Sequence, residues 1–520
     1  MKRAVLFAIL SAMPLLAQNA AETIRLEDLK AHVFFLAADE MQGRNSLSAE
    51  GRIAANYIAA YFMKLGLKPI GDRGSYFQNF NMTKAWLDSA NTQLKLKAGG
   101  AEKTYQFGHD FNYSRESNSP AEITAPVVFL GYGVNAPEYG YNDFASLDVR
   151  GKIAVVLAHE PQETDAGAKF KGRFNTIHAY NWYKIEQLRN AGAAGILLVG
   201  DRNVHRPPRT ASAPTNAQAG PAPQYALAGS FWNVPVFTVT AEVATEILRK
   251  PVYQLQDEID RSLKPQSFEV AGATVTMKKA LKDHQLVSTR NVLGLLEGSD
   301  PQLKDEVVLV TAHYDHVGVV NSRIYRGADD NASGTAAVME IAKAFVAGNV
   351  RPRRSVLFMV FEAEEQGLLG AFYYLDHPVL PLAKTIAVLN MDMIGRDEES
   401  LTWNTRASEN VNGLNVIGTL YNPELRRIID TQNQKTGLKL DYKTDADDKE
   451  GWFARSDHYP FATKSIPMVL FNTGEHPDYH TENDTWDRIN YEKMVRITRL
   501  VFLSAAEVAN AGLKPRFTSN

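Results

Sequence analysis

Four short runs of nearly uninterrupted apolar residues constrain the fold of this chain more than any other feature. The runs cover residues 307–311, 356–361, 386–390 and 467–471. Strands that read as continuous apolar runs are typically buried on both faces of a sheet. Segments with helical periodicity lie between and after the runs, at about 334–347, 423–437 and 491–511. The pattern predicts an α/β domain with a mostly parallel central sheet flanked by helices.

Acidic and imidazole side chains follow the apolar runs. His313 and Asp315 come at the end of the first run, and they point the same way because side chains alternate along a strand. Residues of the same kind occur at four further places. They are Asp329 and Asp330 in the loop GADDNASG, Glu362, Glu364 and Glu365 after the second run, Asp392 after the third run, and His480 in the loop DYHTENDT. Open α/β sheets bind ligands at the carboxyl ends of their strands. These residues therefore form the candidate functional site.

The lack of cysteine narrows the chemistry of this site. The 520 residues contain no Cys, so any metal must be held by His, Asp and Glu. Such donors suit zinc, manganese or cobalt, and a carboxylate-rich set can hold two ions. Hydrolysis at two ions needs one carboxylate that bridges them and another that moves a proton, and the adjacent Glu364 and Glu365 can supply one of each role.

Each of these residues also has an ordinary interpretation. A single Asp or Glu at a strand end is more often a helix cap or a solvated charge. The coincidence of several such residues after strands of one sheet favours a metal site instead. Three further histidines, His316, His458 and His476, are expected to pack, to support neighbouring groups or to lie on the surface.

Six motifs in this part of the chain resemble those of a known family, and they occur in the family's order. They are HYDH, GADDNASG, EAEEQGLLGA, NMDMIG, RSDHYPF and DYHTENDT. The family is that of the dizinc exopeptidases (peptidase family M28), which includes bacterial leucyl aminopeptidases and, more distantly, glutamate carboxypeptidase and glutaminyl cyclase. The resemblance covers about residues 24–120 and 285–511. It implies a hydrolytic enzyme with two Zn²⁺ ions per chain.

The resemblance also implies a set of metal ligands. His313 and Asp392 would hold one zinc ion, and Glu365 and His480 would hold the other. Asp329 would bridge the two ions, and the peptide bond that follows Asp329 would be cis.

Other residues receive catalytic roles from the same resemblance. Glu364 would be the general base, and Asp315 would orient His313. Tyr479 would donate a hydrogen bond to the developing oxyanion. Arg455 would lie near the terminus of the substrate.

The N-terminus predicts export. Lys2 and Arg3 precede an apolar run over residues 4–16, which is typical of a signal peptide, and the leader is expected to cover residues 1–20. A transmembrane anchor is the alternative, but this run is shorter than the roughly 20 residues that cross a bilayer. We therefore expect a periplasmic or extracellular protein.

Residues 121–284 resemble a protease-associated (PA) domain. The resemblance is carried by VVFLGYGVNAPEYGYNDFASLDVRGKIAVVL and by IEQLRNAGAAGILLV. We expect a β-rich PA insert that shapes access to the site, with a mere spacer as the alternative. Residues 21–120 and 285–520 would then form one discontinuous catalytic domain, within the two to four domains expected for 520 residues.

These observations predict a dizinc aminopeptidase that hydrolyses the N-terminal bond of peptides. A carboxypeptidase or dipeptidase of the same fold stays open, because the ligands do not decide which substrate end is bound and Arg455 can pair with a carboxylate. A non-catalytic binding homologue is a third alternative. The net charge of −3 argues against nucleic acid as a partner, and no membrane partner is expected after removal of the leader. The oligomeric state is left open.

Overall fold

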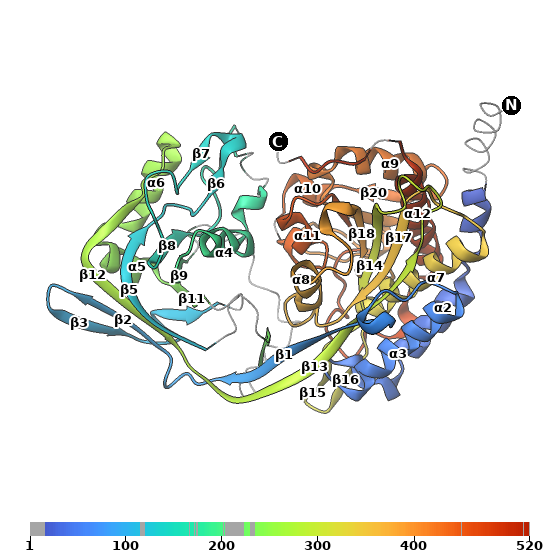
Figure 1. The fold of residues 1–520 in the computed structure, drawn as a ribbon, viewed down its shortest axis with the longest axis horizontal. Helices are drawn as coiled ribbons and strands as arrows, with labels where there is room; N and C mark the ends of the chain where they lie inside the picture. Colours follow the sequence, from blue (N-terminus) through green and yellow to red (C-terminus); the bar gives the residue numbers. More distant parts are fainter. Residues whose placement is uncertain are drawn as a thin grey trace.

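The computed structural model describes residues 16–518 except 115–119, 166, 171, 173–174, 201, 203–222, 229–233, 449 and 513. The described residues form two lobes, each built around one large β-sheet (Figure 1). Most of the expected leader, residues 1–15, lies outside the described residues. Among the helices that the structure describes, none is long and apolar enough to cross a membrane.

A nine-stranded sheet forms the core of the larger lobe. In spatial order its strands are β10 (Gln224–Leu227), β1 (Phe77–Leu87), β13 (Leu281–Leu296), β17 (Ser355–Phe361), β14 (Val307–His313), β18 (Thr385–Met391), β21 (Met468–Asn472), β19 (Gly413–Ile417) and β20 (Lys439–Asp441). The middle strands β17, β14, β18 and β21 are parallel, as are β19 and β20. The other pairings are antiparallel. The α/β class is confirmed, but the sheet is mixed and its parallel pairing is concentrated in the middle.

The middle strands are mostly apolar, and helices cover both faces of the sheet that they form. Along β14, Val308 and Val310 pack into one core, whereas Val307 and Leu309 pack into the other. The first face carries α2 (Leu26–Leu36), α3 (Ala49–Lys64), α7 (Gly334–Ala347), α9 (Pro423–Asn433) and α12 (Tyr491–Asn510). The second face carries α8 (Leu369–Asp376) and α11 (Tyr459–Thr463).

The smaller lobe contains an eight-stranded sheet. Its spatial order is β3 (Ala101–Tyr105), β2 (Gln93–Ala98), β12 (Phe268–Lys279), β5 (Ala121–Phe129), β8 (Ile153–Leu157), β9 (Gly195–Val199), β11 (Val236–Val239) and β4 (Phe111–Tyr113). The helices of this segment are α4 (Asn181–Asn190), α5 (Ala241–Leu248) and α6 (Val252–Ser262).

The division between the sheets differs from the expected domain boundaries. Strands β2, β3 and β4 precede residue 121 but pair into the smaller lobe, whereas β10 follows residue 121 and pairs with β1 in the larger lobe. The reason is hydrogen bonding between strands distant in sequence, which the local pattern does not encode. The assignment of the smaller lobe as a PA domain stays a prediction.

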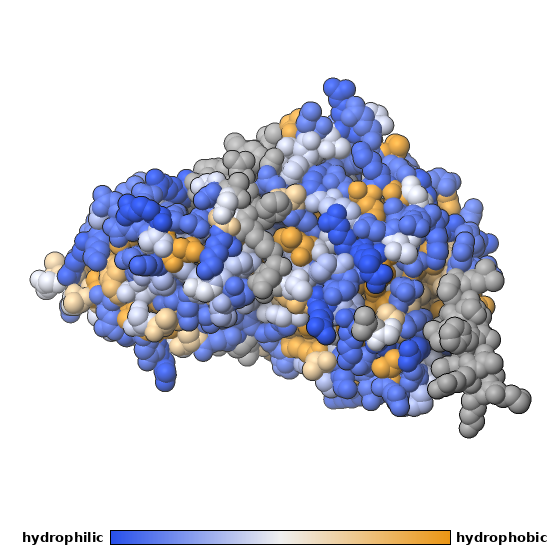
Figure 2. Space-filling view, turned by 90° about the horizontal axis from the view of Figure 1, so that it is seen from above, coloured by the Kyte–Doolittle hydropathy of each residue, from blue (hydrophilic) through white to orange (hydrophobic). Residues whose placement is uncertain are grey.

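Two features join the lobes. Strands β1 and β13 pair along their length and run from one lobe toward the other (Figure 1). In addition, α4 packs toward α8, where the rings of Trp182 and Phe372 lie 5.0 Å apart. The face of the molecule turned toward the viewer in Figure 2 is mostly hydrophilic, with small separate hydrophobic groups.

Candidate metal centre

The candidate site lies where three adjacent parallel strands end. His313 is the last residue of β14, Asp392 follows β18 directly, and Glu364 and Glu365 come shortly after β17. Because these strands are parallel neighbours, their carboxyl ends meet at one edge of the sheet. Two loops reach the same edge, one that opens α7 and includes a helical turn η5 (Ala328–Ser333), and one between β21 and α12 that carries His480.

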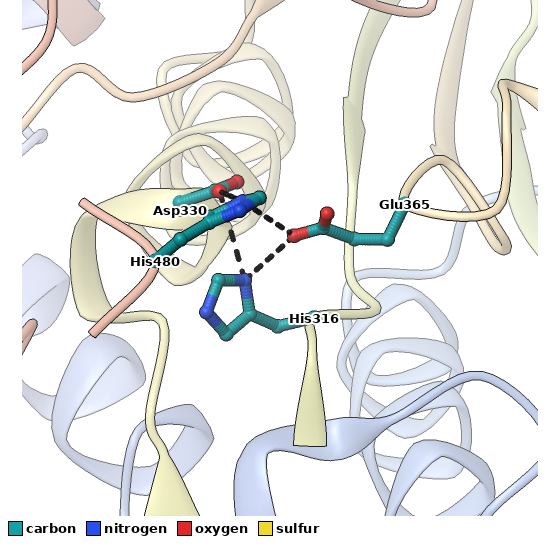
Figure 3. Close-up of side chains that lie close together, drawn as sticks. All are labelled: His316, Asp330, Glu365 and His480. Carbon is teal, nitrogen blue, oxygen red and sulfur yellow. Dashed lines mark hydrogen bonds and ion pairs between the residues drawn. The ribbon is translucent and has the colours of Figure 1, made fainter. Parts of the chain in front are cut away.

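One group of donors consists of His316, Asp330, Glu365 and His480 (Figure 3). His316 Nδ1 lies 2.8 Å from Glu365 Oε1 and 3.6 Å from Asp330 Oδ2. His480 Nε2 lies 2.9 Å from Asp330 Oδ2 and 3.3 Å from Glu365 Oε1. The four donor atoms therefore converge on one point.

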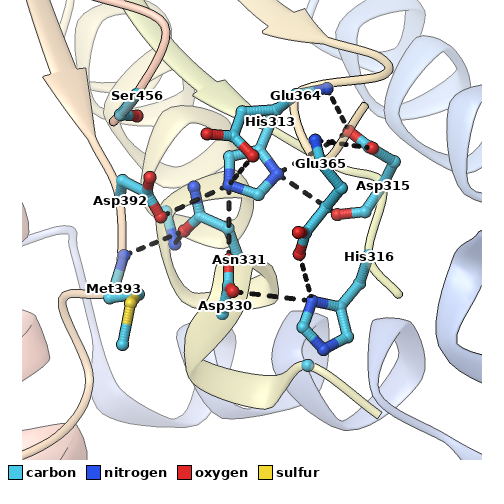
Figure 4. A network of polar contacts seen from close by, with 12 residues as sticks. His313, Asp315, His316, Asp330, Asn331, Glu364, Glu365, Asp392, Met393 and Ser456 are labelled. Atoms are coloured by element: carbon cyan, nitrogen blue, oxygen red, sulfur yellow. Dashed lines mark hydrogen bonds and ion pairs between the residues drawn. The ribbon is translucent and has the colours of Figure 1, made fainter. Parts of the chain in front are cut away.

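A second group consists of His313, Asp330 and Asp392 (Figure 4). His313 Nε2 lies 3.3 Å from Asp392 Oδ1 and 3.4 Å from Asp330 Oδ1. Asp330 thus faces the second group with one oxygen and the first group with the other. Within each group the donor atoms all lie within 4.8 Å of one another.

Asp330 occupies the place that the sequence assigned to Asp329. Asp329 belongs to neither donor group: its Oδ1 accepts a hydrogen bond of 2.6 Å from the Gly395 amide, and its Oδ2 lies 3.2 Å from His476 Nε2. The cis peptide bond joins Asp330 and Asn331, so the prediction of a cis bond after Asp329 is wrong. The two carboxylates are neighbours in η5 but have different partners.

Asp315 organises the backbone around the site. Its carboxylate accepts hydrogen bonds from Ser46 Oγ at 2.8 Å and from the amides of Glu364 at 3.1 Å and Glu365 at 3.3 Å. It also lies 3.7 Å from His313 Nδ1, and the Asp315 carbonyl lies 3.2 Å from the same nitrogen. Asp315 therefore faces Nδ1, which leaves Nε2 of His313 directed toward the second donor group.

Glu364 lies beside the donor groups but belongs to neither. Its Oε2 is 4.0 Å from His313 Nε2. Burial raises the pKa of the Glu364 carboxyl well above its usual range, and the carboxylates of Asp392, Glu365 and Asp457 raise it further against the opposing effect of His313. A carboxyl with a raised pKa next to a cation site is suited to accept and return a proton.

The electrostatics of the two donor groups favour a cation. Burial alone would raise the pKa of Glu365, but the imidazoles of His480 and His316 together outweigh it and lower this pKa to about 2. Burial alone would lower the pKa of His313, but the carboxylates of Glu364 and Asp392 hold it well above 6.5. The site therefore concentrates negative charge that attracts protons, and the same charge attracts a divalent ion. Imidazole and carboxylate donors in this arrangement fit zinc.

Tyr479 and Arg455 lie next to the first donor group. The Tyr479 ring stacks on His480 with centroids 4.0 Å apart. Arg455 Nη2 donates to the Tyr479 hydroxyl at 3.3 Å, Nη1 lies 2.9 Å from Glu475 Oε1, and the guanidinium covers the Trp452 ring at 4.1 Å. The charge of Arg455 is thus partly balanced by Glu475.

Arg44 lies near the site but is not among the residues that the sequence predicts there. Arg44 is fully buried and donates to the carbonyls of Leu36, Tyr314, Arg326 and Gly327. It ties the segment after β14 to the loop before Asp330. A buried arginine at the end of a short helical turn has no local sequence signal.

The three histidines expected to be ordinary have different surroundings. His476 pairs with Asp329, and burial lowers the pKa of His458 to about 3. His316 instead joins the first donor group. The motif HYDH contained the relevant signal, since a second histidine three residues after a strand end can turn back toward the same edge.

The fold and the two donor groups define an α/β protein with a candidate cation site at the carboxyl ends of parallel strands. The model of Peptidase family M28 matches residues 291–505. The chain therefore contains a Peptidase family M28 domain, which confirms the resemblance carried by the ordered motifs.

Individual relatives span part of the chain. Aminopeptidase YwaD of Bacillus subtilis (strain 168) is 29% identical over 256 residues, 47% of this chain and 51% of that protein. The probable glutamate carboxypeptidase VP8 of Zea mays is 24% identical over 422 residues, 75% of this chain and 54% of that protein. The chain thus spans about half the length of these curated relatives. Among solved structures, an aminopeptidase from Aneurinibacillus sp. strain AM-1 aligns over 96% of both chains, with 18% identity and a TM-score of 0.47.

Proposed function

We propose that the chain is a dizinc exopeptidase that releases the N-terminal residue of peptides. The observation that carries the proposal is the pair of donor groups that share Asp330, with the unshared carboxyl of Glu364 beside them. His313 and Asp392 would hold one Zn²⁺ ion, Glu365 and His480 would hold the other, and Asp330 would offer one carboxylate oxygen to each group. The arrangement matches the requirement of two-metal hydrolysis for one bridging and one free carboxylate.

The protein side chains have distinct tasks in this proposal. When bound, the two ions polarise the scissile carbonyl and make a water molecule acidic enough to react at neutral pH. Glu364 accepts the proton of this water at its carboxylate and delivers it to the leaving amine. Asp315 holds His313 in position and fixes the backbone of Glu364 through its amide. Tyr479 donates its hydroxyl hydrogen to the oxygen that gains negative charge.

The charges around the site favour a substrate amine over a substrate carboxylate. Glu364, Asp392 and Asp457 lie near one another and repel, as the raised pKa values of Glu364 and Asp457 indicate, with burial as the larger cause in each case. A protonated α-amine placed among these carboxylates would offset their repulsion, whereas a substrate carboxylate would add to it. The guanidinium of Arg455, which lies beside Tyr479, is already paired with Glu475.

A carboxypeptidase is the second candidate, because the partly exposed guanidinium of Arg455 lies beside Tyr479 and can receive a carboxylate if Glu475 moves. A substrate panel separates the two. We expect hydrolysis of dipeptides and of aminoacyl p-nitroanilides with a free amine, and none when the amine is acetylated or a chelator is present. Hydrolysis of N-acetylated peptides with a free carboxylate, but not of their amides, would contradict the aminopeptidase proposal.

The localisation and the smaller lobe complete the proposal. The basic and apolar N-terminus supports export to the periplasm or the medium. A role of the PA-like insert in substrate access is supported by the hydrogen bond of 2.9 Å from the Tyr180 hydroxyl to Asp448. Asp448 also accepts from the amides of Trp452 and Phe453, in the segment that carries Arg455.

A further inference from the structure

The His316 side chain is buried in the first donor group without forming a hydrogen bond of its own. Neither of its ring nitrogens has a hydrogen-bond partner among the residues that the structure describes, and the same holds for Glu365 Oε1. Yet His316 Nδ1 and Glu365 Oε1 lie 2.8 Å apart. Two buried polar atoms that approach so closely without hydrogen-bond alignment need a common partner.

The spacing of the four donor atoms fits a single metal ion. With bonds of about 2.0–2.2 Å, two ligands in a tetrahedral arrangement lie roughly 3.4 Å apart. Four of the six distances between the donor atoms are 2.8, 2.9, 3.3 and 3.6 Å, which bracket this value. The imidazole rings of His316 and His480 are turned by 73° to each other, so their donor nitrogens approach from different directions (Figure 3).

The surrounding backbone holds the His316 ring in this place. The His316 amide donates to the Arg44 carbonyl at 3.3 Å. Gly327 lies against the ring, and a Cβ atom there would come within 2.5 Å of the His316 ring carbons Cγ and Cδ2. Gly327 also has a φ of +60°, which favours glycine. The loop before Asp330 therefore packs directly against the His316 ring.

We infer that His316 is a fourth protein ligand at the position formed by Asp330, Glu365 and His480. This inference rests on the proposed dizinc function and goes beyond it, because it makes the two positions unequal. The first position has four protein donors and is closed, whereas the second has the three donors His313, Asp330 and Asp392 and keeps a free place. Closed four-ligand zinc sites are typical of structural zinc, and three-ligand sites with an open place are typical of catalytic zinc.

The unequal donor sets predict unequal affinities. The four-ligand position binds its ion more tightly and releases it more slowly to a chelator. The three-ligand position binds the substrate carbonyl or water and loses its ion first. His316 thus slows the release of zinc from the four-ligand position. Glu364 lies near the three-ligand position, with its Oε2 4.0 Å from His313 Nε2.

Zinc binding by the full chain tests the inference. The wild-type protein, His316→Ala and His313→Ala are equilibrated with buffers of stepwise free zinc, and bound zinc is measured by elemental analysis. We expect two unequal affinities in the wild type. His316→Ala should weaken the tighter one more than about 100-fold, since even supporting residues around a metal ligand contribute 10- to 100-fold. His313→Ala should weaken the other position instead.

Two additional measurements separate ligand loss from misfolding. Added imidazole should restore the tighter affinity of His316→Ala by entering the space left by the ring. Thermal unfolding in the presence of chelator should show a folded His316→Ala protein. If His316→Ala folds and binds zinc as the wild type does, or if it loses affinity that imidazole does not restore, the inference is overturned while the dizinc proposal stands. If the wild type binds fewer than two ions, the proposed function fails as well.

Discussion

Asp329 and Asp330 are neighbours in the chain, but their carboxylates have different surroundings. Asp330 faces both donor groups, whereas Asp329 accepts from the Gly395 amide and pairs with His476. Asp329 thus supports the loop, and Asp330 offers its oxygens to the cation site. Exchanging carboxylate for amide at each position separates these two roles.

Asp330→Asn should lose both zinc ions, because a neutral amide does not bridge two cations. Asp329→Asn should keep two ions, since an amide oxygen can still accept from Gly395, and its cost should appear as a lower melting temperature. Elemental analysis after dialysis and a thermal scan measure the two effects. Zinc loss in the Asp329 variant with full zinc in the Asp330 variant would refute the assignment.

The proton transfer assigned to Glu364 gives a second prediction. Glu364→Gln should keep its zinc, because Glu364 belongs to neither donor group, and should lower kcat by about 100- to 10,000-fold, the usual contribution of a general base. Steady-state rates and zinc content are measured together. Glu297→Gln, a substitution at a half-exposed position, serves as the control and should leave kcat unchanged. Wild-type turnover in Glu364→Gln would remove Glu364 from the mechanism.

The sequence predicts some of these residues better than others. His313, Glu364, Glu365 and Asp392 end buried parallel strands, so the apolar runs already bring them to one edge. The choice between Asp329 and its neighbour depends on the conformation of a loop, where no periodicity applies. His316 lies beyond the end of β14, so its direction depends on the Arg44 carbonyl and Gly327 rather than on strand alternation.

Among the structural elements, the short helical turn η1 (Asp39–Arg44) connects several segments around the candidate site. Its last residue, Arg44, donates to four carbonyls from α2, the segment after β14 and the loop before η5. A planar guanidinium can satisfy such separated acceptors, and the compact ammonium of lysine cannot. Arg44 therefore fixes the distance between the segments that carry His316 and Asp330.

Arg44→Lys should destabilise the chain and loosen the cation site together. Each buried carbonyl that loses its donor costs about 1–3 kcal/mol, so the free energy of unfolding should fall by at least about 2 kcal/mol. Zinc affinity should fall as well, because the two loops are no longer held together. Chemical unfolding and zinc titration measure these effects. An unchanged zinc affinity in a destabilised protein would limit Arg44 to a stabilising role.

At the level of elements, burial explains which strands are predictable. The middle strands are covered on both faces and read as apolar runs. The first eight residues of strand β13 are exposed or partly exposed, and most of the following residues are buried. This second part includes residues 292–296, which pair with β17 in the larger lobe. The sequence of β13 therefore shows no single periodicity, and neither its length nor its antiparallel pairing with β17 can be predicted.

On the scale of the whole molecule, the smaller lobe carries buried charge of its own. Glu160 accepts hydrogen bonds from the Thr176 amide at 2.9 Å and from its hydroxyl. Lys184 Nζ donates to the carbonyls of Tyr132 and Leu157. Burial raises the pKa of Glu160 to about 8 and lowers that of Lys184 to about 7. The stability of this lobe therefore depends on pH near neutrality.

The sign of the effect at Glu160 follows from proton binding. The folded chain holds the Glu160 proton more tightly than the unfolded chain, so this group stabilises the fold at low pH and loses that contribution as pH rises from about 4.5 to about 8. Glu160→Gln removes this dependence, and its melting temperature should fall several degrees less than that of the wild type over this range. The exposed Glu258→Gln is the control. Parallel curves for Glu160→Gln and the wild type would contradict the raised pKa.

The proposed activity requires both two zinc ions and a free substrate amine. Both requirements are tested when zinc is added stepwise to the chelated full chain and hydrolysis of leucyl p-nitroanilide and of its N-acetyl derivative is followed. We predict that hydrolysis of the free-amine substrate rises to a plateau at two zinc ions per chain and that the acetylated substrate stays intact. Full activity in the chelated protein, or equal hydrolysis of both substrates, would contradict the claim.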